Sequence, residues 1–362
     1  MDMEKFFGQL YGSTYHPFLS EDLMEGPPSC TKADFKHPRL RRYPFDLETV
    51  NWDEAIVLGV GLDGHVWRVR FQDDETYYAL KVFWINRPPQ SPHEYSARIE
   101  CQNNALLQMV ETAVQNANMM GEPIVLGDRP ENRLVARHNL FSFCDEYRGR
   151  ARQKRLQRFA KQAEQALEPA KDTEPVLEAE LVKMVEKVKQ AGLAGEVKQV
   201  KQVEHRERTE YTEQPNRVDE PERKPGSFRL PPPPVSKPVK IDSVPPLVRC
   251  YGWLPFGSKD IRKMPRQIQP YAYERKGVTV RRLRDSEEHV AIVYEYVPGD
   301  KNTIEDVDQA IFFFHCVGFH MNAFTHERNW REGKLIDYSD LMSPFSVGWS
   351  RHRWHARSFL KS

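Results

Sequence analysis

Long apolar runs are absent from this sequence. No stretch reaches the roughly eighteen apolar residues that a transmembrane helix needs, so we expect no membrane-spanning helix and no membrane partner. The first residues are acidic and lack a long apolar stretch, which predicts that they are not a secretory signal. The net charge of +1 gives no general case for binding nucleic acid.

Cysteine is also scarce. The five cysteines are scattered and include no Cys-x-x-Cys pair, which argues against a disulfide framework and predicts a reducing compartment, the nucleus or the cytoplasm. The histidines form no zinc motif. His315 and His320 lie five residues apart in a predicted helix and therefore point to different faces, whereas a helical zinc pair needs a spacing of four.

What the sequence does contain is a glycine-rich run between two strand-like segments. Gly59, Gly61 and Gly64 have the spacing G-x-G-x-x-G. Alternating apolar residues follow the run, so the glycines belong to a hairpin and do not open a helix as in a dinucleotide-binding fold. Glycine has no Cβ and allows a close approach to phosphates. The pattern favours a nucleotide loop of the protein-kinase type, in which Val66 covers a purine and Lys81 reaches the phosphates.

Two further segments follow in the order that protein kinases have them. Ala79-Leu80-Lys81 resembles the A-x-K strand that carries the phosphate-binding lysine. A helix predicted over about 93–118 contains Glu100, nineteen residues after Lys81, where a kinase glutamate pairs with that lysine. Glu94, near the start of the helix, is the alternative partner.

The later part of the chain continues this order. Residues 291–299 resemble the fifth strand and hinge, where backbone groups near Glu295 to Val297 would bind the adenine edge. The segment from Lys334 to Asp340 resembles the strand and D-F-G motif whose aspartate holds magnesium, here Asp337.

The catalytic half of that pattern is degraded. No aspartate lies between Asp308 and Asp337, and Asn322 stands where a kinase has its base, although an amide cannot accept a proton from a hydroxyl. Asn329 is the candidate second magnesium ligand. The segment lacks the D-F-G glycine, no A-P-E follows, and only 25 residues remain after Asp337.

These motifs together resemble the protein-kinase superfamily. They are similar in particular to a fungal group of truncated kinase-like proteins that includes the Fta-two subunit of the Sim-four kinetochore complex. The resemblance covers about 50–145 and 245–345. It implies an α+β fold in which the small lobe has a five-stranded antiparallel sheet and one helix, and the helical large lobe is reduced. It also implies a nuclear, chromosome-associated role.

Composition divides the chain into segments. We expect an N-terminal arm (1–45), followed by the first part of a small lobe (46–147). A charged, proline-ended insertion that is disordered or helical (148–240) separates it from the end of the small lobe and the hinge (241–299). A truncated large lobe (300–345), with an apolar helix over 303–324, and a basic tail (346–362) complete the chain. The basic run at 148–161 is either a nucleic-acid or nuclear-import patch or a solvated helix face.

Two functions remain open. The first is a pseudokinase that recruits protein partners, with or without bound Mg-ATP, and the second is an atypical phosphotransferase that acts on a protein or a small molecule. The missing base and the short C-terminal part favour the first. Positioning and electrostatics supply most of phosphoryl-transfer catalysis, so the second stays open. The expected nucleotide-binding residues are Gly59, Gly61, Gly64, Val66, Ala79, Lys81, Glu100, Glu295 and Val297, and the expected magnesium ligands are Asp337 and Asn329.

Overall fold

The structure is a computed structural model. It describes residues 16–71, 74–85, 95–127, 130–150, 153, 157, 238–276, 278–284, 287–322, 326–346 and 349. Its two compact units are residues 1–146 with 236–362, and residues 147–235. Glu94, nearly all of the predicted insertion and most of the basic tail lie outside the described residues. Among the residues that are described, no helix is long and apolar enough to cross a membrane.

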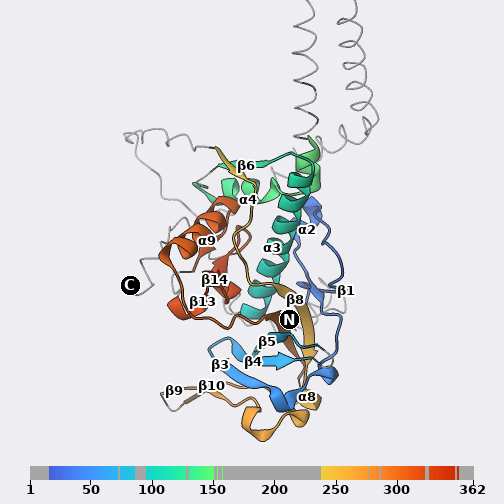
Figure 1. Ribbon diagram of the computed structural model, residues 1–362, viewed down its shortest axis with the longest axis vertical. Coiled ribbons are helices and arrows are strands. Elements are labelled where there is room, and N and C mark those ends of the chain that lie inside the picture. Colours follow the sequence, from blue (N-terminus) through green and yellow to red (C-terminus); the bar gives the residue numbers. More distant parts are fainter. Residues whose placement is uncertain are drawn as a thin grey trace, which may run out of the picture. The chain divides into compact units, whose positions relative to one another are not determined.

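The first unit is a mixed α+β fold built on a seven-stranded sheet with the order β1-β2-β8-β11-β5-β4-β3 (Figure 1). The strands are β1 (Leu19–Leu23), β2 (Leu40–Arg42), β3 (Ile56–Val60), β4 (Gly64–Arg70), β5 (Tyr77–Phe83), β8 (Cys250–Phe256) and β11 (His289–Glu295). The last five pair antiparallel throughout. The sheet is nevertheless larger than the five strands expected.

The two additional strands come from the predicted N-terminal arm. β1 pairs with β2 and β2 pairs with β8, both in parallel. Between them lies the short helix α2 (Lys32–Lys36), which begins with a capping box at Thr31 and buries Phe35 completely. Residues 16–45 are therefore part of the packed sheet, and the prediction of a separate arm is wrong for them. β2 can approach β8 because Gly252 has φ +126°, and a Cβ there would lie 2.7 Å from Tyr43 N.

Alternating side chains explain the central hairpins. In β4, Trp67 and Val69 are fully buried, and in β5, Leu80 and Val82 are fully buried. These side chains join one hydrophobic core with residues of β8 and β11. The indole Nε1 of Trp67 donates to the Ile268 carbonyl at 2.8 Å, which satisfies its buried polar group.

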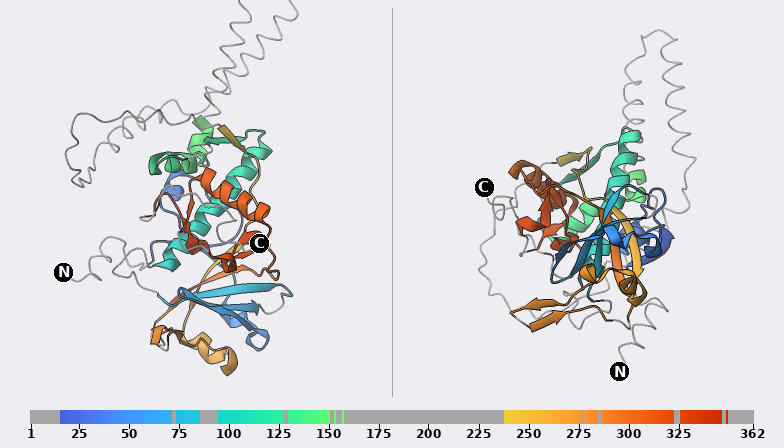
Figure 2. Two further views of the ribbon diagram at one scale, coloured as in Figure 1. Left: turned by 90° about the vertical axis from the view of Figure 1, so that its left-hand side faces the viewer. Right: turned by 60° about the horizontal axis from the view of Figure 1, so that its bottom comes forward.

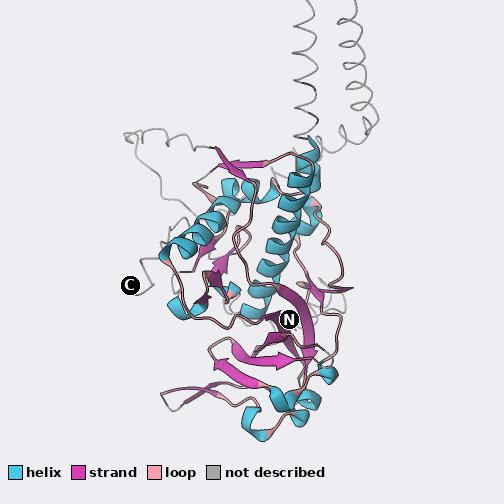
Figure 3. Cartoon of the chain, viewed as in Figure 1, coloured by secondary structure: helices cyan, strands magenta, loops and turns pink. Residues whose placement is uncertain are grey.

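The main helix of the fold is α3 (Ser96–Met119), shown with the other helices in Figure 3. The apolar stripe that predicted it is buried: Leu106, Met109, Val110, Ala113, Val114 and Ala117. The helix contacts β2 on one side and the 3₁₀ helix η6 and β15 on the other. It thereby connects the sheet to the C-terminal part of the chain.

The C-terminal part consists of one helix and very short elements. They are α9 (Ile304–Val317), β12 (His320–Met321), η5 (Glu327–Asn329), β13 (Trp330–Arg331), β14 (Lys334–Leu335), η6 (Tyr338–Asp340) and β15 (Leu341–Met342). The helix predicted over 303–324 ends at Val317 because Gly318 forms a left-handed C-cap at φ +112°. There a Cβ would lie 2.5 Å from the Ala136 carbonyl oxygen, so only glycine fits.

Two smaller groups of elements complete the described unit. One contains β6 (Ile124–Gly127), α4 (Arg133–Phe141) and β7 (Pro238–Ile241), and β6 pairs with β7. The predicted insertion therefore ends earlier than residue 240, because residues 238–241 are a strand. The other group lies between β8 and β11 and contains α8 (Ser258–Lys263), η4 (Arg266–Ile268), β9 (Tyr273–Arg275) and β10 (Val278–Arg281) (Figure 2). The remaining 3₁₀ helices are η1 (Leu47–Thr49) and η2 (Trp52–Glu54).

Candidate ligand-binding site

A cavity of about 740 Å³ lies between the glycine-rich hairpin and the short elements of the C-terminal part. Most of the residues singled out in the sequence line it: Gly59, Gly61, Gly64, Val66, Ala79, Lys81, Glu295, Val297, Asn322, Asn329 and Asp337. Glu100 is not among the lining residues, since it is completely buried. The volume falls within the range typical of small-molecule and cofactor sites.

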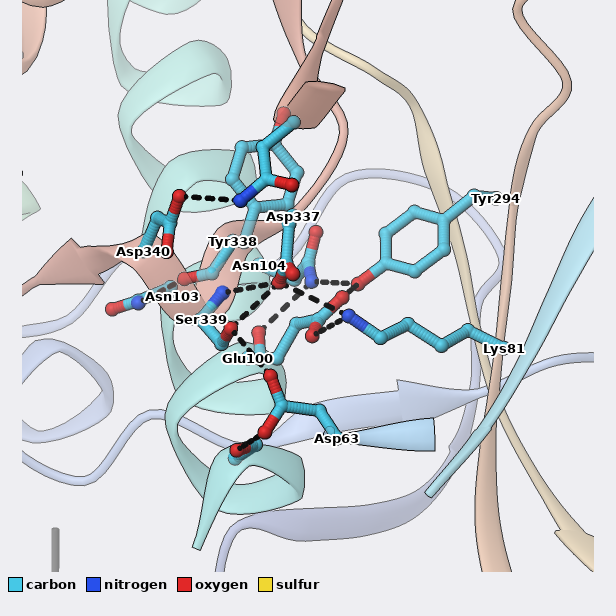
Figure 4. Close-up of polar contacts among 12 residues, drawn as sticks. Asp63, Lys81, Glu100, Asn103, Asn104, Tyr294, Asp337, Tyr338, Ser339 and Asp340 are labelled. Atoms are coloured by element: carbon cyan, nitrogen blue, oxygen red, sulfur yellow. Dashed lines mark hydrogen bonds and ion pairs between the residues drawn. The ribbon is translucent and has the colours of Figure 1, made fainter. Parts of the chain in front are cut away.

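Lys81 and Glu100 form an ion pair at the base of the cavity (Figure 4). Lys81 Nζ lies 2.7 Å from Glu100 Oε2, so the strand β5 and the helix α3 bring the two residues together as the sequence spacing predicts. Burial raises the pKa of Glu100 to about 7 against the opposing charge of Lys81. Burial alone would lower the pKa of Lys81, but the carboxylates of Asp337 and Glu100 hold it above its usual value.

Asp337 joins the same cluster. Its Oδ1 lies 3.0 Å from Lys81 Nζ and accepts hydrogen bonds from the hydroxyl and the backbone N–H of Ser339. Burial would raise the pKa of Asp337, but Lys81 and the Ser339 hydrogen bonds keep it below its usual value, so the carboxylate stays ionised. Among the described residues Oδ2 accepts no hydrogen bond, which leaves that oxygen for a cation or ligand in the cavity.

Two residues that the sequence reading missed support Glu100. Tyr294 on β11 donates its hydroxyl to Glu100 Oε1 at 2.6 Å. Asn104, one turn along α3, donates to both the Tyr294 hydroxyl (2.7 Å) and the Glu100 carbonyl (2.9 Å). Each carboxylate oxygen of Glu100 therefore has a donor, as a buried charge requires. The only sequence signal was the tyrosine inside an otherwise apolar strand.

Asp63 is a further residue that was missed. It stands at the tip of the glycine-rich hairpin and lines the cavity. Its Oδ1 accepts a hydrogen bond from the Ser96 hydroxyl at the start of α3 (2.5 Å), and its Oδ2 lies 3.4 Å from Ser339 Oγ, whose hydrogen is directed to Asp337. The hairpin tip is thus tied to α3 and places a negative charge beside the Asp337 segment.

The three glycines of the hairpin differ in whether their surroundings leave room for a side chain. At Gly64 a Cβ would lie 2.2 Å from the Val82 carbonyl oxygen, so glycine is needed for the close approach of β4 and β5. At Gly59 and Gly61 a Cβ would meet nothing within 4 Å. Those two positions leave open space above the cavity. Trp84 anchors the loop by donating its indole N–H to the Gly61 carbonyl at 2.8 Å.

Asn329 and Asp340 form a second polar pair in the cavity wall. Asn329 Nδ2 donates to Asp340 Oδ2 at 2.8 Å, so the amide group of Asn329 is directed to Asp340. Burial raises the pKa of Asp340 to about 6, and the negative charge of Asp337 acts in the same direction. The backbone N–H of Asn322 donates to the Asp340 carbonyl at 2.6 Å. Asp340 is thus a carboxyl that titrates near neutral pH beside the expected metal ligands.

Some polar groups of the hinge-like segment already make hydrogen bonds and an ion pair within the protein. The Glu295 N–H donates to the Arg249 carbonyl, and the Glu295 carboxylate pairs with Lys334 at 2.8 Å. The Arg249 N–H also donates to this carboxylate. Backbone contacts to a ligand would therefore come from residues 296 and 297, both of which line the cavity.

The residues present fit a magnesium ion only in part. Asp337 offers one oxygen without a hydrogen bond, and Asn329 can offer its carbonyl oxygen while its amide group holds Asp340. Among the described residues, no group of three or more His, Cys, Asp or Glu side chains is placed to hold a metal. A hard cation here would depend on oxygen atoms from a ligand, such as phosphate groups, as magnesium in nucleotide sites does.

The fold and the cavity define an α+β protein with a buried Lys–Glu–Asp cluster beneath a glycine-rich hairpin. The chain matches no protein-family model, no curated protein and no solved structure.

Proposed function

We propose that this protein is a kinase-like nucleotide-binding module that acts as a pseudokinase and presents a surface to protein partners. The observation that carries the proposal is the cluster of Lys81, Glu100 and Asp337 at the base of the cavity that the glycine-rich hairpin roofs. The consecutive elements β5 and α3 supply the first two residues, and a segment 256 positions after Lys81 supplies Asp337. Mg-ATP is the proposed ligand, with the purine beside Val66 and Ala79 and the phosphates toward Lys81.

The side of the cavity where a phosphate acceptor would bind supports binding over catalysis. Asn322 lines the cavity at the expected base position, and an amide cannot take a proton from a hydroxyl. A nuclear adaptor role is the one implied by the resemblance to truncated fungal kinase-like proteins of the kinetochore, and a cavity that binds without catalysis is consistent with it.

Calorimetric titration with Mg-ATP tests the nucleotide site. We expect saturable binding by the wild type and loss of binding in Lys81→Ala and Asp337→Ala. Ala79→Leu should also abolish binding because it fills the purine side of the cavity without touching the charge cluster. The control is Lys259→Ala, an exposed lysine on α8. Failure of the wild type to bind Mg-ATP, or unchanged binding in Ala79→Leu, would overturn the nucleotide proposal.

One observation favours a second function, an atypical phosphotransferase. Asp340 lines the cavity and has a pKa raised to about 6, so its carboxylate is a candidate proton acceptor where Asn322 is not. Transfer of labelled phosphate from ATP to a protein or small molecule would support this function if it is lost in both Lys81→Ala and Asp340→Asn. Such turnover would replace the pseudokinase proposal, and its absence in a protein that binds Mg-ATP would support the binding module.

A further inference from the structure

The β9–β10 hairpin and its flanks carry a concentration of positive charge of which only Arg281 lines the candidate site. Residues 266–284 contain six cations, Arg266, Arg275, Lys276, Arg281, Arg282 and Arg284, against one carboxylate, Glu274. The whole chain has a net charge of only +1. The hairpin leaves the sheet between β8 and β11 and extends away from it as a two-stranded ribbon (Figure 2).

The ribbon and its flanks expose five of these cations, all but Arg281, together with apolar and aromatic side chains. Arg275 is paired in register with Val278, so both lie on one face of the ribbon. Val278 is 65% exposed and Tyr271, just before β9, is 58% exposed. Exposed cations and two large exposed side chains therefore lie close together in the chain around this hairpin.

The turn of the ribbon contains a residue in an unfavourable conformation. Lys276 has φ +53°, in the left-handed region that glycine, asparagine and aspartate adopt more easily than lysine. Lysine there costs roughly 1 kcal/mol relative to those residues. The turn thus places a cation at the tip of the ribbon at the expense of local stability.

Most of this charge is not neutralised within the described residues. Arg284 pairs with Glu287 at 3.0 Å. Within the part of the chain that the structure describes, Arg275, Lys276 and Arg282 make no ion pair, and all three are exposed. The three cations, which lie in β9, at the tip and directly after β10, are therefore available to a polyanionic partner.

We propose that the β9–β10 ribbon is a nucleic-acid-binding element that contacts the phosphodiester backbone. A two-stranded ribbon has the width that the major groove of duplex DNA admits. Arginine matches phosphate with two parallel hydrogen bonds, and the exposed tyrosine can stack or donate to a sugar or phosphate. An acidic peptide fits less well, because a projecting ribbon offers it no groove. Arg281 of the ribbon lines the nucleotide cavity, but Arg275, Lys276 and Arg282, which carry this proposal, do not.

Salt-dependent binding to a short fluorescent DNA duplex tests the ribbon. The test variant combines Arg275→Ala, Lys276→Asn and Arg282→Ala, where asparagine tolerates the positive φ of the turn. Each lost phosphate contact reduces the slope of log K against log salt by about 0.9, so we expect the slope to fall by roughly 2 to 3 and the affinity to fall about tenfold at low salt. The full chain is used, so its other basic segments stay the same in both proteins.

The matched control removes three cations from the neighbouring helix α8, with Lys259→Ala, Arg262→Ala and Lys263→Ala. All three are exposed, and they belong to the same insertion between β8 and β11. We expect this control to keep most of the affinity and slope. Equal losses in both variants, or no loss in the ribbon variant, would overturn the proposal. The same titration with single-stranded RNA distinguishes duplex binding from single-strand binding. Binding of polyglutamate that depends on the ribbon, without any DNA binding, would show that the partner is an acidic protein.

Discussion

The two walls of the cavity are built in different ways. The wall that carries Lys81 is a sheet whose four central strands β4, β5, β8 and β11 have seven residues each and are joined by antiparallel ladders of backbone hydrogen bonds. The wall that carries Asp337 consists of two-residue strands and 3₁₀ turns. Short backbone ladders pair β12 with β15 and β13 with β14, but side chains attach these segments to α3 and to residue 248. Asn103 donates to the Tyr338 and Leu341 carbonyls, and Tyr338 donates its hydroxyl to Val248 O.

The two walls therefore differ in what keeps their cavity-lining residues in place. The backbone ladders of the sheet wall form with many different exposed side chains, so exposed substitutions there should cost little, while its buried core residues remain necessary. A wall held by individual side chains depends on each of them. The two walls should therefore respond differently to single substitutions, and the following predictions compare them.

The largest effect is expected in the core of the sheet wall. Trp67→Ala removes a fully buried indole and leaves its partner carbonyl at Ile268 without a donor. We expect the free energy of unfolding to fall by about 4 kcal/mol, typical of a tryptophan truncated in a core. Urea denaturation measures this loss. Ile56→Ala on the edge strand β3, where the side chain is 48% exposed, is the control and should cost less than about 1 kcal/mol.

The second prediction compares two amides on the same helix. Asn103→Ala leaves the Tyr338 and Leu341 carbonyls without their buried donor, and we expect a loss of about 3 kcal/mol. Gln108 also donates to a backbone carbonyl, that of Cys250, but Cys250 belongs to β8 and is also held by the ladder with β11. Gln108→Ala should therefore cost about 1 kcal/mol.

Hydrogen exchange distinguishes the two amide variants further. Asn103→Ala should accelerate exchange of the amides in residues 338–342 more than those of β5, because only the wall that carries Asp337 loses its attachment. Uniform acceleration across both walls would contradict the idea that the second wall is held by side chains.

The sequence predicted the sheet wall better than the other wall. Alternating apolar residues around the glycines indicated the hairpin, and the spacing of Lys81 and Glu100 fits a strand followed by a helix. Both signals are local. The contacts of Glu100 with Tyr294 and of Asn103 with Tyr338 join residues 194 and 235 positions apart, and no local pattern marks such pairs.

Short strands were missed for a related reason. β1 and β2 have five and three residues, too few for an apolar period to stand out, and prolines surround them. Their place in the sheet depends on Gly252 of β8, more than 200 positions later. The roles of Asp63 and Asp340 were missed because turn and cap positions commonly carry aspartate without any ligand.

The third prediction uses the pH dependence of the side-chain wall. The folded pKa of Asp340 is raised to about 6, above its unfolded value of 3.8. A raised pKa means that the folded state holds the proton more tightly, so this stabilisation is complete below pH 3.8 and is lost as the pH rises through 6. Between pH 4 and 7 the wild type should lose about 2 kcal/mol of stability relative to Asp340→Asn.

Asp74 on the sheet side gives the opposite sign and serves as the control. Hydrogen bonds from Tyr78 and Thr76 lower the pKa of Asp74. Its contribution is therefore present above pH 3.8 and lost as the pH falls further, so Asp74→Asn should show no change relative to the wild type between pH 5 and 7. Denaturation curves at a series of pH values measure both differences. A wild type that parallels Asp340→Asn at every pH would contradict the raised pKa.

The smallest effect is expected where the two walls meet. The Asp63 carboxylate on the hairpin lies 3.4 Å from Ser339 Oγ of the other wall, and its charge contributes to the raised pKa of Lys81. If the cavity binds Mg-ATP as proposed, this carboxylate repels the phosphates. Asp63→Asn should then strengthen Mg-ATP binding by about 1 kcal/mol, or roughly fivefold, and more at low salt. Asp53→Asn, an equal charge change at an exposed position before β3, should leave the affinity unchanged. Weaker binding in Asp63→Asn would mean instead that the hairpin must be tied to Ser339 for the ligand to bind, and that the walls act as one unit.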